Sequence, residues 1–343
     1  MKNLSWFNKV MFSLNIVLTV LTFIAYILPF LAPKLFPILS VFTLLMPLML
    51  IFNLLFFIYW LIQIKKQMLL SGIVLLLGIT FINKFYKFPS EELPVETKDF
   101  TLMSYNVRLF NLYEWMPNHD VPEQITSFVK EENPDILCIQ EFTPLDKANF
   151  KQYKHKFVFL RGGKNKYGQA IFSKFPIVHN GDIEFPNSGN NVIFADIKKG
   201  KDTIRVYSMH MQSIKISPDI HEEINQEKSE MIFKRISEAF KEQQMQAEMI
   251  KNHKKDCHYP QMICGDMNNS AFSFVYRNIK GNLKDSFEEA GSGVGKSYNY
   301  RYYPARIDYI FADKTMKVKS FKNFTSFVNS DHFPIMARIA FED

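Results

Sequence analysis

The first ninety residues consist mainly of long apolar stretches, whereas the rest of the chain alternates short apolar runs with polar turns. Three long stretches contain no charged side chain, at about residues 10–31, 36–62 and 68–83. A helix needs roughly 20 apolar residues to cross a bilayer, so the first two stretches predict transmembrane helices. The third is shorter, and it either crosses as well or enters and leaves the membrane on one side. We therefore predict an all-α transmembrane anchor over residues 1–87.

The lysines that flank these stretches indicate an orientation, because positively charged loops tend to remain in the cytoplasm. With three spans and a cytoplasmic N-terminus, four lysines lie inside and three outside: Lys2, Lys9, Lys65 and Lys66 against Lys34, Lys84 and Lys87. This small excess favours an extracytoplasmic position for the rest of the chain, and the position inverts if the third stretch does not cross. The stretches contain no Asp, Glu, Arg or His, which indicates anchoring and not a transport pathway.

A polar segment with two prolines, residues 88–98, is typical of a linker. From residue 99 to residue 343 the pattern changes to short apolar runs bounded by turn residues, as in β-strands. The runs that predict strands cover residues 101–107, 135–141, 169–178, 191–197, 204–211, 261–266, 306–313 and 333–341. Helical patterns at Pro122–Glu132 and from about His221 to Lys255 alternate with some of these runs. The predicted fold class of this part is α/β, in one layered domain.

The formal net charge of +7 is unevenly distributed along the chain. Residues 1–90 contain seven lysines and no arginine or acidic residue, which leaves 34 basic against 34 acidic side chains in the remainder. A neutral domain does not favour tight binding of duplex nucleic acid, because that binding depends on neutralising phosphates. The chain has three cysteines. This small and odd number does not favour a disulfide framework. The apolar runs around Cys138 and Cys264 instead predict buried free thiols.

Polar side chains recur where the predicted strands end. They are Asn106, Glu141, His210, Asp266, Asn268, Asp308, Asp331 and His332. Taken singly, most have a plain structural explanation. Asp266 and Asn268 suit a turn, and His210 suits the role of a core histidine whose hydrogen bonds are made within the protein. Asp308 is harder to explain in this way, because a carboxylate between two apolar neighbours in a strand needs a partner. Side chains at the ends of strands converge in α/β folds, so the set as a whole predicts a functional site.

The residue types in this set fit the hydrolysis of a phosphodiester. That reaction needs oxygen ligands for a hard divalent cation, a base for the attacking water and donors that stabilise the transition state. A histidine beside a carboxylate, which fixes its tautomer, completes the set. The sequence has no H-E-x-x-H, G-x-x-x-x-G-K or G-x-S-x-G motif, so zinc-protease, P-loop and nucleophile-elbow chemistry lack support.

Seven short motifs in this order resemble the endonuclease/exonuclease/phosphatase superfamily, which includes pancreatic deoxyribonuclease, exonuclease III, inositol polyphosphate phosphatases and neutral sphingomyelinases. The motifs are SYNVR, IQE, GQAIFSKFPI, YSMHMQS, ICGDMNN, RIDYIF and SDHFPI. The resemblance covers residues 99–343 and implies a DNase I-like fold, which is a four-layer α/β sandwich of two mixed β-sheets flanked by helices. A three-span anchor ahead of such a domain is similar to a bacterial branch of the superfamily, and this implies a bacterial inner membrane as the location.

The resemblance also implies roles for individual residues. Mg²⁺, for which Mn²⁺ would substitute, is expected at Glu141, with Asn106 beside it and Asp331 contributing. Asp266 is expected to orient or deprotonate the attacking water, with Asn268 holding a phosphate oxygen.

The remaining roles concern the transition state and the substrate. His332, positioned by Asp308, is expected to stabilise the transition state. His210 matches a histidine of the deoxyribonuclease and sphingomyelinase branches, where abasic endonucleases have a tyrosine. The further substrate-binding candidates are Arg108, Asn191 and Gln212.

The leading hypothesis is a membrane-anchored, Mg²⁺-dependent phosphoesterase that hydrolyses a phosphodiester, as nucleases of the family do. Its partners would be the phosphoester substrate and the lipid bilayer, and no protein partner is inferred. A phospholipid head group is an alternative substrate, since a tether raises the local concentration at the bilayer, and a phosphomonoester is another. A non-catalytic, membrane-tethered binding module is a hypothesis of a different class, which the complete set of acids, amides and histidines opposes.

Overall fold

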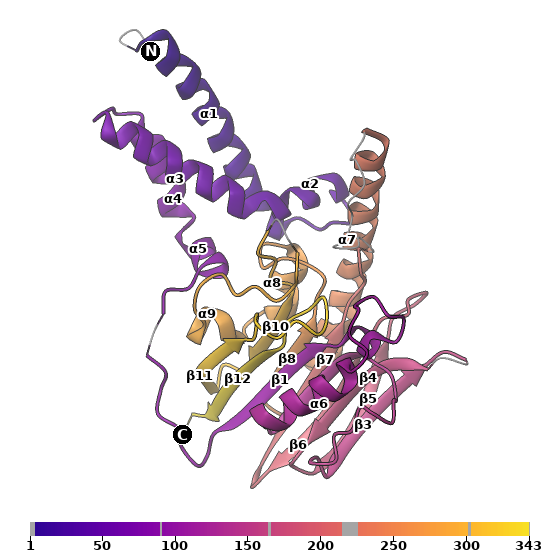
Figure 1. Cartoon of the computed structure of the whole chain (residues 1–343). Helices are drawn as coiled ribbons and strands as arrows, with labels where there is room; N and C mark the ends of the chain where they lie inside the picture. Colours follow the sequence, from indigo (N-terminus) through magenta and orange to yellow (C-terminus); the bar gives the residue numbers. More distant parts are fainter. Residues whose placement is uncertain (1–3, 90, 164–165, 215–225, 301–302, 343) are drawn as a thin grey trace.

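The computed structural model describes residues 4–89, 91–163, 166–214, 226–300 and 303–342. Seven helical elements precede the first strand, and we refer to them together as the helical segment (Figure 1). They are α1 (Trp6–Ile27), η1 (Leu28–Phe30), α2 (Pro37–Val41), η2 (Phe42–Leu45), α3 (Met46–Ile62), α4 (Met68–Leu77) and α5 (Ile79–Phe85).

Two stretches of the helical segment, Trp6–Phe30 and Pro37–Ile62, are long and apolar enough to cross a membrane. The third predicted stretch forms α4 and α5, which meet at an angle of 68° and form either a broken span or a re-entrant loop. In Figure 1, α1 and α3 point away from the sheets, so that the N-terminus and the loop after α3 lie at the far end.

Polar side chains join the helices of this segment to one another. Asn15 of α1 donates a hydrogen bond from Nδ2 to Ser71 Oγ of α4, at 2.8 Å, and accepts one from Trp60 Nε1 of α3, at 3.1 Å. Asn53 Nδ2 of α3 donates to Thr22 Oγ1 of α1, at 2.9 Å. Hydrogen bonds of this kind hold helices together where lipid supplies no hydrophobic driving force. The three helices therefore pack as a bundle, with their large apolar side chains mostly outward.

The rest of the chain folds into two six-stranded mixed sheets, with the orders β11-β12-β1-β2-β4-β3 and β5-β6-β7-β8-β10-β9. We call this part the β-sandwich domain. Its strands are β1 (Phe100–Asn106), β2 (Ile136–Phe142), β3 (His155–Arg161), β4 (Tyr167–Ser173), β5 (Ile177–Glu184), β6 (Asn191–Lys199), β7 (Asp202–His210), β8 (Gln261–Asp266), β9 (Lys284–Asp285), β10 (Asp308–Ala312), β11 (Met316–Asn323) and β12 (Ile335–Phe341). Each sheet contains one parallel pair, β1 with β2 and β7 with β8.

Three apolar clusters stack these elements into four layers, as predicted. One cluster lies between the sheets and contains Leu102 and Val206 among others. A second packs α6 (Val121–Glu132) on the outer face of the first sheet, and a third packs α7 (Gln226–Lys255) and α8 (Phe274–Lys280) on the outer face of the other. Cys138 and Cys264 are buried free thiols in the central cluster, which confirms that prediction.

The structure corrects two details of the predicted elements. The run at residues 169–178 is not one strand, because the chain leaves β4 at Ser173 and enters β5 of the other sheet at Ile177, past Pro176. The strands β3 and β11 and the short helices α8 and α9 (Ser286–Ala290) were not predicted. The helix α6 confirms the prediction at residues 122–132, whereas the predicted start of α7, at residues 221–225, lies outside the described residues.

The helical segment and the β-sandwich domain are packed against each other. Phe272, in the loop after β8, is buried in one cluster with Ala25, Met46 and Leu50 of the helical segment. The backbone N–H of Lys34 donates to Gln244 Oε1 of α7, at 2.9 Å. The predicted linker also lies on the domain, since Arg338 donates to the carbonyls of residues 93 and 94. The catalytic candidates therefore have a fixed position relative to the helical segment.

Candidate active site

The four strands of the two parallel pairs end at one edge of the sandwich, and each brings a polar side chain to it. Asn106 ends β1, His210 ends β7 and Asp266 ends β8, while Glu141 is the next-to-last residue of β2. In the ladder between β7 and β8, His210 pairs with Asp266. This edge lies at the carboxyl ends of parallel strands, where functional side chains of α/β folds converge.

Glu141 is directed into the site by a β-bulge. The register of β2 against β4 shifts between Gln140 and Phe142, and Glu141 has a φ of +51°. A bulge of this kind turns one side chain out of the alternation of the strand. Asn106 Nδ2 donates to Glu141 Oε1, at 3.3 Å, and to Asp266 Oδ2, at 3.2 Å. The amide thus holds the two carboxylates side by side.

The turn after β8 fixes the orientation of Asp266. The backbone N–H of Asn268 donates to Asp266 Oδ1, at 2.8 Å, and Asn268 Nδ2 donates to Asp266 Oδ2, at 3.0 Å. Asn268 Nδ2 also donates to the carbonyl of Met211, at 3.0 Å. With its amide hydrogens engaged inside the protein, Asn268 positions Asp266 in this structure and does not offer them to a phosphate.

Gly265 is required where β8 approaches β7. It has a φ of +125°, and a Cβ atom there would lie 2.1 Å from the carbonyl oxygen of Met209. Only glycine adopts this backbone conformation without strain. The glycine lets the two central strands of the second sheet end together, with His210 and Asp266 as neighbours.

Asp308 and His332 form a buried pair beside Asp266. His332 Nδ1 lies 2.9 Å from Asp308 Oδ2, and His332 Nε2 lies 3.6 Å from Asp266 Oδ2. Burial acts to lower the pKa of His332, but the charges of Asp308 and Asp266 outweigh it and raise this pKa well above its usual value. His332 is therefore an imidazolium at neutral pH, held by one carboxylate and facing another.

His210 differs from His332 although both lie at the same edge, His332 buried and His210 partly exposed. Burial, assisted by the charge of His332, lowers the pKa of His210 to about 3. Its Nε2 lies 3.7 Å from Glu141 Oε1 and 3.8 Å from Asp266 Oδ2, which is too far for a hydrogen bond. His210 is therefore a neutral imidazole, and its polar edge is directed at the same two carboxylates.

Arg108 and Asp331 complete the edge. Arg108 Nε lies 3.4 Å from Asp331 Oδ2, and the guanidinium lies over the ring of Trp115 with its carbon 4.6 Å from the ring centre. The backbone from Arg108 to Asn111 is left-handed at four consecutive residues, with φ between +45° and +60°. Non-glycine residues adopt this conformation at a cost of about 1–2 kcal/mol each. The turn is thus a strained segment directly beside the site.

The carboxylates at this edge provide a set of oxygens suited to a hard cation. Burial raises the pKa of Glu141, and the charge of Asp331 raises it further. Burial also raises the pKa of Asp266, to about 7. Asp266, Asp308 and His332 offer ligand atoms within 4.8 Å of one another, but a protonated His332 has no free ring nitrogen to coordinate a metal.

The oxygens of Glu141 and its neighbours therefore suit a cation better than the Asp308–His332 pair does. Asn106 would contribute its oxygen only if the amide turned over, since Oδ1 accepts a hydrogen bond from the backbone N–H of Arg108, at 3.1 Å. Asp331 lines the same cavity as Glu141.

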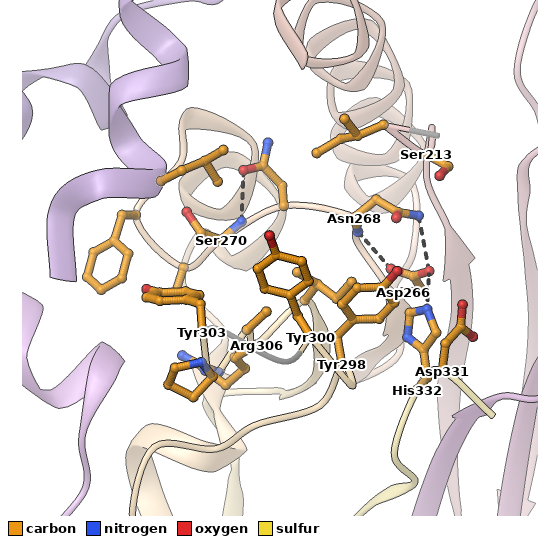
Figure 2. A pocket seen from close by; sticks show the side chains of 18 of the residues that line it. Ser213, Asp266, Asn268, Ser270, Tyr298, Tyr300, Tyr303, Arg306, Asp331 and His332 are labelled. Atoms are coloured by element: carbon orange, nitrogen blue, oxygen red, sulfur yellow. Dashed lines mark hydrogen bonds and ion pairs between the residues drawn. The ribbon is translucent and has the colours of Figure 1, made fainter. Parts of the chain in front are cut away.

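These side chains line one end of a cavity of about 730 Å³ (Figure 2). The cavity contains Arg108, Glu141, His210, Asp266, Asn268, Asp331 and His332 of the predicted set. Its described lining also includes residues that the sequence did not indicate, namely Tyr298, Tyr300, Tyr303, Arg306, Lys84 and Leu45. The tyrosines before β10 stand out in the sequence by their number. Nothing in the sequence indicates that leucines of the apolar N-terminal runs line the cavity.

Two predicted substrate-binding residues lie outside the described lining of the cavity. Asn191 is buried at the start of β6, where its Oδ1 accepts a hydrogen bond from Gln169 Nε2, at 2.9 Å. Gln212 accepts a hydrogen bond at Oε1 from Ser188 Oγ, at 3.0 Å, and at its carbonyl from Gln243 Nε2, at 2.7 Å. The structure therefore places both residues in the framework around the site, and not on its surface.

Comparison with protein-family models gives two matches. The Endonuclease/Exonuclease/phosphatase family model matches residues 103–332, which is about two thirds of the chain. A model described as a domain of unknown function (DUF8431) matches residues 8–85, the helical segment. The search of curated proteins returned no match.

Solved structures of similar fold cover about 70% of the chain. A mannosyl-6-phosphatase from Bacteroides thetaiotaomicron has 19% identity and a TM-score of 0.52, with 71% of this chain and 100% of that chain covered. An endonuclease/exonuclease/phosphatase from Bacteroides vulgatus has 19% identity and a TM-score of 0.53, with 71% and 99% covered. D. rerio TDP2 in complex with a single-strand DNA product has 16% identity and a TM-score of 0.52, with 70% and 98% covered. At these low identities, the matches show a shared fold and nothing further about this chain.

Proposed function

Because this chain belongs to the endonuclease/exonuclease/phosphatase family of metal-dependent phosphoester hydrolases, we propose that it is a membrane-anchored, Mg²⁺-dependent phosphodiesterase. The observation that carries the proposal is the position of Asp266. This carboxylate faces the His332 imidazolium at 3.6 Å, is oriented by Asn268, and lies beside Glu141 at the end of a cavity.

Asp266 is proposed as the base that accepts the proton of the attacking water. Burial raises its pKa to about 7, which is the range in which a general base works best near neutral pH. The two hydrogen bonds from Asn268 direct the Asp266 carboxylate into the cavity, so that Asn268 acts as a positioning residue. His210, as a neutral imidazole on the other side, offers a further hydrogen bond to substrate or water.

The residues proposed to hold Mg²⁺, or Mn²⁺ in its place, are Glu141 and Asp331, with Asn106 behind them. Carboxylate oxygens are the ligands that this cation prefers. When bound, it supplies positive charge to the phosphoryl oxygens and the leaving group.

His332 is proposed to donate a hydrogen bond from Nε2 to a phosphoryl oxygen as negative charge develops there. Asp308 holds the other ring nitrogen and keeps the imidazole protonated and oriented. Arg108, which lines the same cavity, is proposed as a second positive group at the phosphate.

The helical segment is proposed to cross a bacterial inner membrane, with the β-sandwich domain extracytoplasmic. In this arrangement the far ends of α1 and α3, with Lys9 and Lys65, lie on the cytoplasmic side. The contacts of the helical segment with Phe272 would then hold the cavity at the membrane surface. This location supports a lipid head group as substrate more than a nucleic acid, since the charge of the β-sandwich domain is balanced.

The test uses the full chain, purified in detergent, and bis-p-nitrophenyl phosphate as a generic phosphodiester. Hydrolysis is expected with Mg²⁺ or Mn²⁺ and should stop when EDTA is added and resume when the cation is restored. His332→Gln should abolish the activity in a protein that is still folded, as circular dichroism would show, although loss of the pairing with Asp308 lowers its thermal stability. The proposal fails if hydrolysis persists in EDTA, or if it persists at the wild-type rate in the His332 variant.

A further inference from the structure

We propose that the substrate is an amphiphilic phosphoester whose apolar chain lies between the β-sandwich domain and the helical segment, while its phosphate lies at Asp266 and His332. The inference rests on the proposed function and adds the class of substrate. It is carried by the shape of the catalytic cavity, because that cavity does not end within the β-sandwich domain. It continues to a region lined by Leu44, Leu45, Leu48, Phe85, Phe272 and Val294, which we call the apolar arm.

The apolar arm has walls from both parts of the chain. Leu44 and Leu45 belong to η2 and Leu48 to the first turn of α3, so the helical segment supplies one wall. Phe272 and Val294 come from loops of the β-sandwich domain and form the opposite wall. A membrane helix that served only as a tether would not need to line the catalytic cavity. Here it completes the cavity.

Tyrosine rings connect the apolar arm to the catalytic end. The ring of Tyr298 meets the ring of His332 edge-on, with centres 4.9 Å apart and an angle of 64°. Figure 2 shows Tyr298 and Tyr300 between the catalytic side chains and Tyr303, which lies toward the violet ribbon of the helical segment. Tyrosine presents an apolar ring and one polar group, which suits the passage from a charged phosphate to a hydrocarbon chain.

The apolar arm is open toward the lipid. Leu45 and Leu48 line the cavity, yet their exposed fractions are 42% and 40%. Ile51, one turn further along α3, is 40% exposed and lies on the surface that a bilayer would cover. An apolar chain can therefore pass from the bilayer into the apolar arm without crossing water.

Among the described residues, the cationic groups of the cavity do not form a track for a polyanion. Lys84 Nζ donates to the carbonyl of Ala271, at 3.4 Å. Arg306 Nη1 is paired with Asp285 Oδ2 at 2.8 Å, and Arg108 Nε lies 3.4 Å from Asp331 Oδ2. A strand of nucleic acid needs a positively charged groove along several phosphates. One phosphate at the carboxylate end and a hydrocarbon chain in the apolar arm match the charges and the apolar walls better.

The test compares two phosphodiesters that release the same chromophore, methyl p-nitrophenyl phosphate and octyl p-nitrophenyl phosphate. The full chain is reconstituted in lipid nanodiscs with Mg²⁺. Burying one methylene favours binding by roughly three- to fourfold, so kcat/KM for the octyl compound should exceed that for the methyl compound by at least about 100-fold.

Leu48→Trp fills the apolar arm and should lower kcat/KM for the octyl compound at least about tenfold, with the methyl compound almost unaffected. Leu55→Trp adds the same ring to the lipid-facing side of α3, where the leucine is 54% exposed, and should change neither value. Val294→Trp fills the apolar arm from the side of the β-sandwich domain and should have the same effect as Leu48→Trp. It provides an independent test if Leu48→Trp disturbs membrane insertion.

The inference is overturned if kcat/KM of the wild-type protein is the same for both compounds. It is also overturned if Leu48→Trp and Val294→Trp lower kcat/KM equally for both compounds. It is also overturned if single-stranded DNA is cleaved faster than the octyl compound and Leu48→Trp leaves that cleavage intact. Failure of the proposed function gives a different result, because methyl p-nitrophenyl phosphate would then not be hydrolysed at all.

Discussion

His332 and Asp308 form a hydrogen-bonded pair between the two sheets. Asp308 begins β10 of the second sheet, and His332 precedes β12 of the first. The 2.9 Å contact between His332 Nδ1 and Asp308 Oδ2 therefore joins the two sheets at the catalytic edge. It also leaves Nε2 of the same ring directed at Asp266.

Replacing Asp308 by asparagine is expected to weaken catalysis and to move its dependence on pH. The carboxylate of Asp308 helps to raise the pKa of His332, so its removal lowers that pKa. Because the imidazolium is the active form, loss of activity on the alkaline side should begin at a lower pH in the variant. The rate near neutral pH should fall by roughly 10²-fold.

The measurement is a pH–rate profile of kcat/KM for bis-p-nitrophenyl phosphate. Thermal unfolding at each pH controls for loss of the folded state, since the pair also joins the sheets. An alkaline limb that stays in place would contradict the assigned role of Asp308.

Replacing Glu141 by glutamine is expected to weaken binding of the divalent cation by at least about tenfold. The change keeps the shape of the side chain but removes its charge. Isothermal titration of Mn²⁺ into the full chain measures the affinity. Glu123→Gln is the matched control, because Glu123 lies on the exposed face of α6 and pairs only with Lys147 among the described residues. Equal affinities in both variants would show that Glu141 is not a ligand.

Binding of the cation should depend on pH through Asp266. Burial raises the pKa of this carboxyl from its ordinary value of 3.8 to about 7, so it becomes negatively charged above pH 7. Because Asp266 lies beside Glu141, its charge should strengthen the attraction for a cation held by Glu141 and Asp331. The apparent affinity for Mn²⁺ should rise by up to about tenfold per pH unit below pH 7 and level off above pH 8. Titrations in buffers of different ionisation enthalpy report the released proton. In Asp266→Asn this dependence should disappear.

Replacing Gly265 by alanine should destabilise the β-sandwich domain by about 2 kcal/mol or more in the free energy of unfolding. The added Cβ atom would lie 2.1 Å from the carbonyl of Met209, at a φ that disfavours any side chain. Gly163→Ala, where a Cβ atom meets nothing within 4 Å, should change stability by less than about 0.5 kcal/mol. Chemical denaturation followed by tryptophan fluorescence compares the two.

The position of the domain relative to the membrane can be tested with reporter fusions. Alkaline phosphatase fused after Asp343 should be active, and a fusion after Lys66 should be inactive, because α3 ends on the opposite side from the sheets. A cytoplasmic signal at the C-terminus would contradict the proposed extracytoplasmic position of the β-sandwich domain.

The sequence allowed the fold class and the gathering of polar side chains at one edge of the sandwich to be predicted, because both depend on local pattern. Apolar runs that end in polar residues marked β1, β2, β7 and β8, and the parallel pairs bring those ends together. The separation of β4 from β5 was not predictable from that pattern, since the apolar run resumes at Phe175 directly after Ser173 and Lys174, where the chain passes between the sheets.

Other features depend on contacts between residues far apart in the chain. The role of Asn268 as a support for Asp266 rests on hydrogen bonds that close only in the folded turn. The opposite pKa shifts of His210 and His332 also depend on folded contacts, since burial and the charge of His332 lower the pKa of His210 whereas Asp308 and Asp266 raise that of His332. The cavity wall at Leu48 needs the packing of two separate parts of the chain, which no local pattern encodes.

Phe272 lies four residues after Asn268 and is buried among Ala25, Met46 and Leu50. The loop after Asp266, which carries Asn268, and the helices of the helical segment therefore share one buried apolar cluster. Across related sequences, the size of the residue at position 272 should co-vary with the sizes of those three positions. Exchange of the N-terminal helices for an unrelated anchor would keep the domain at a membrane but remove the support of its own catalytic loop.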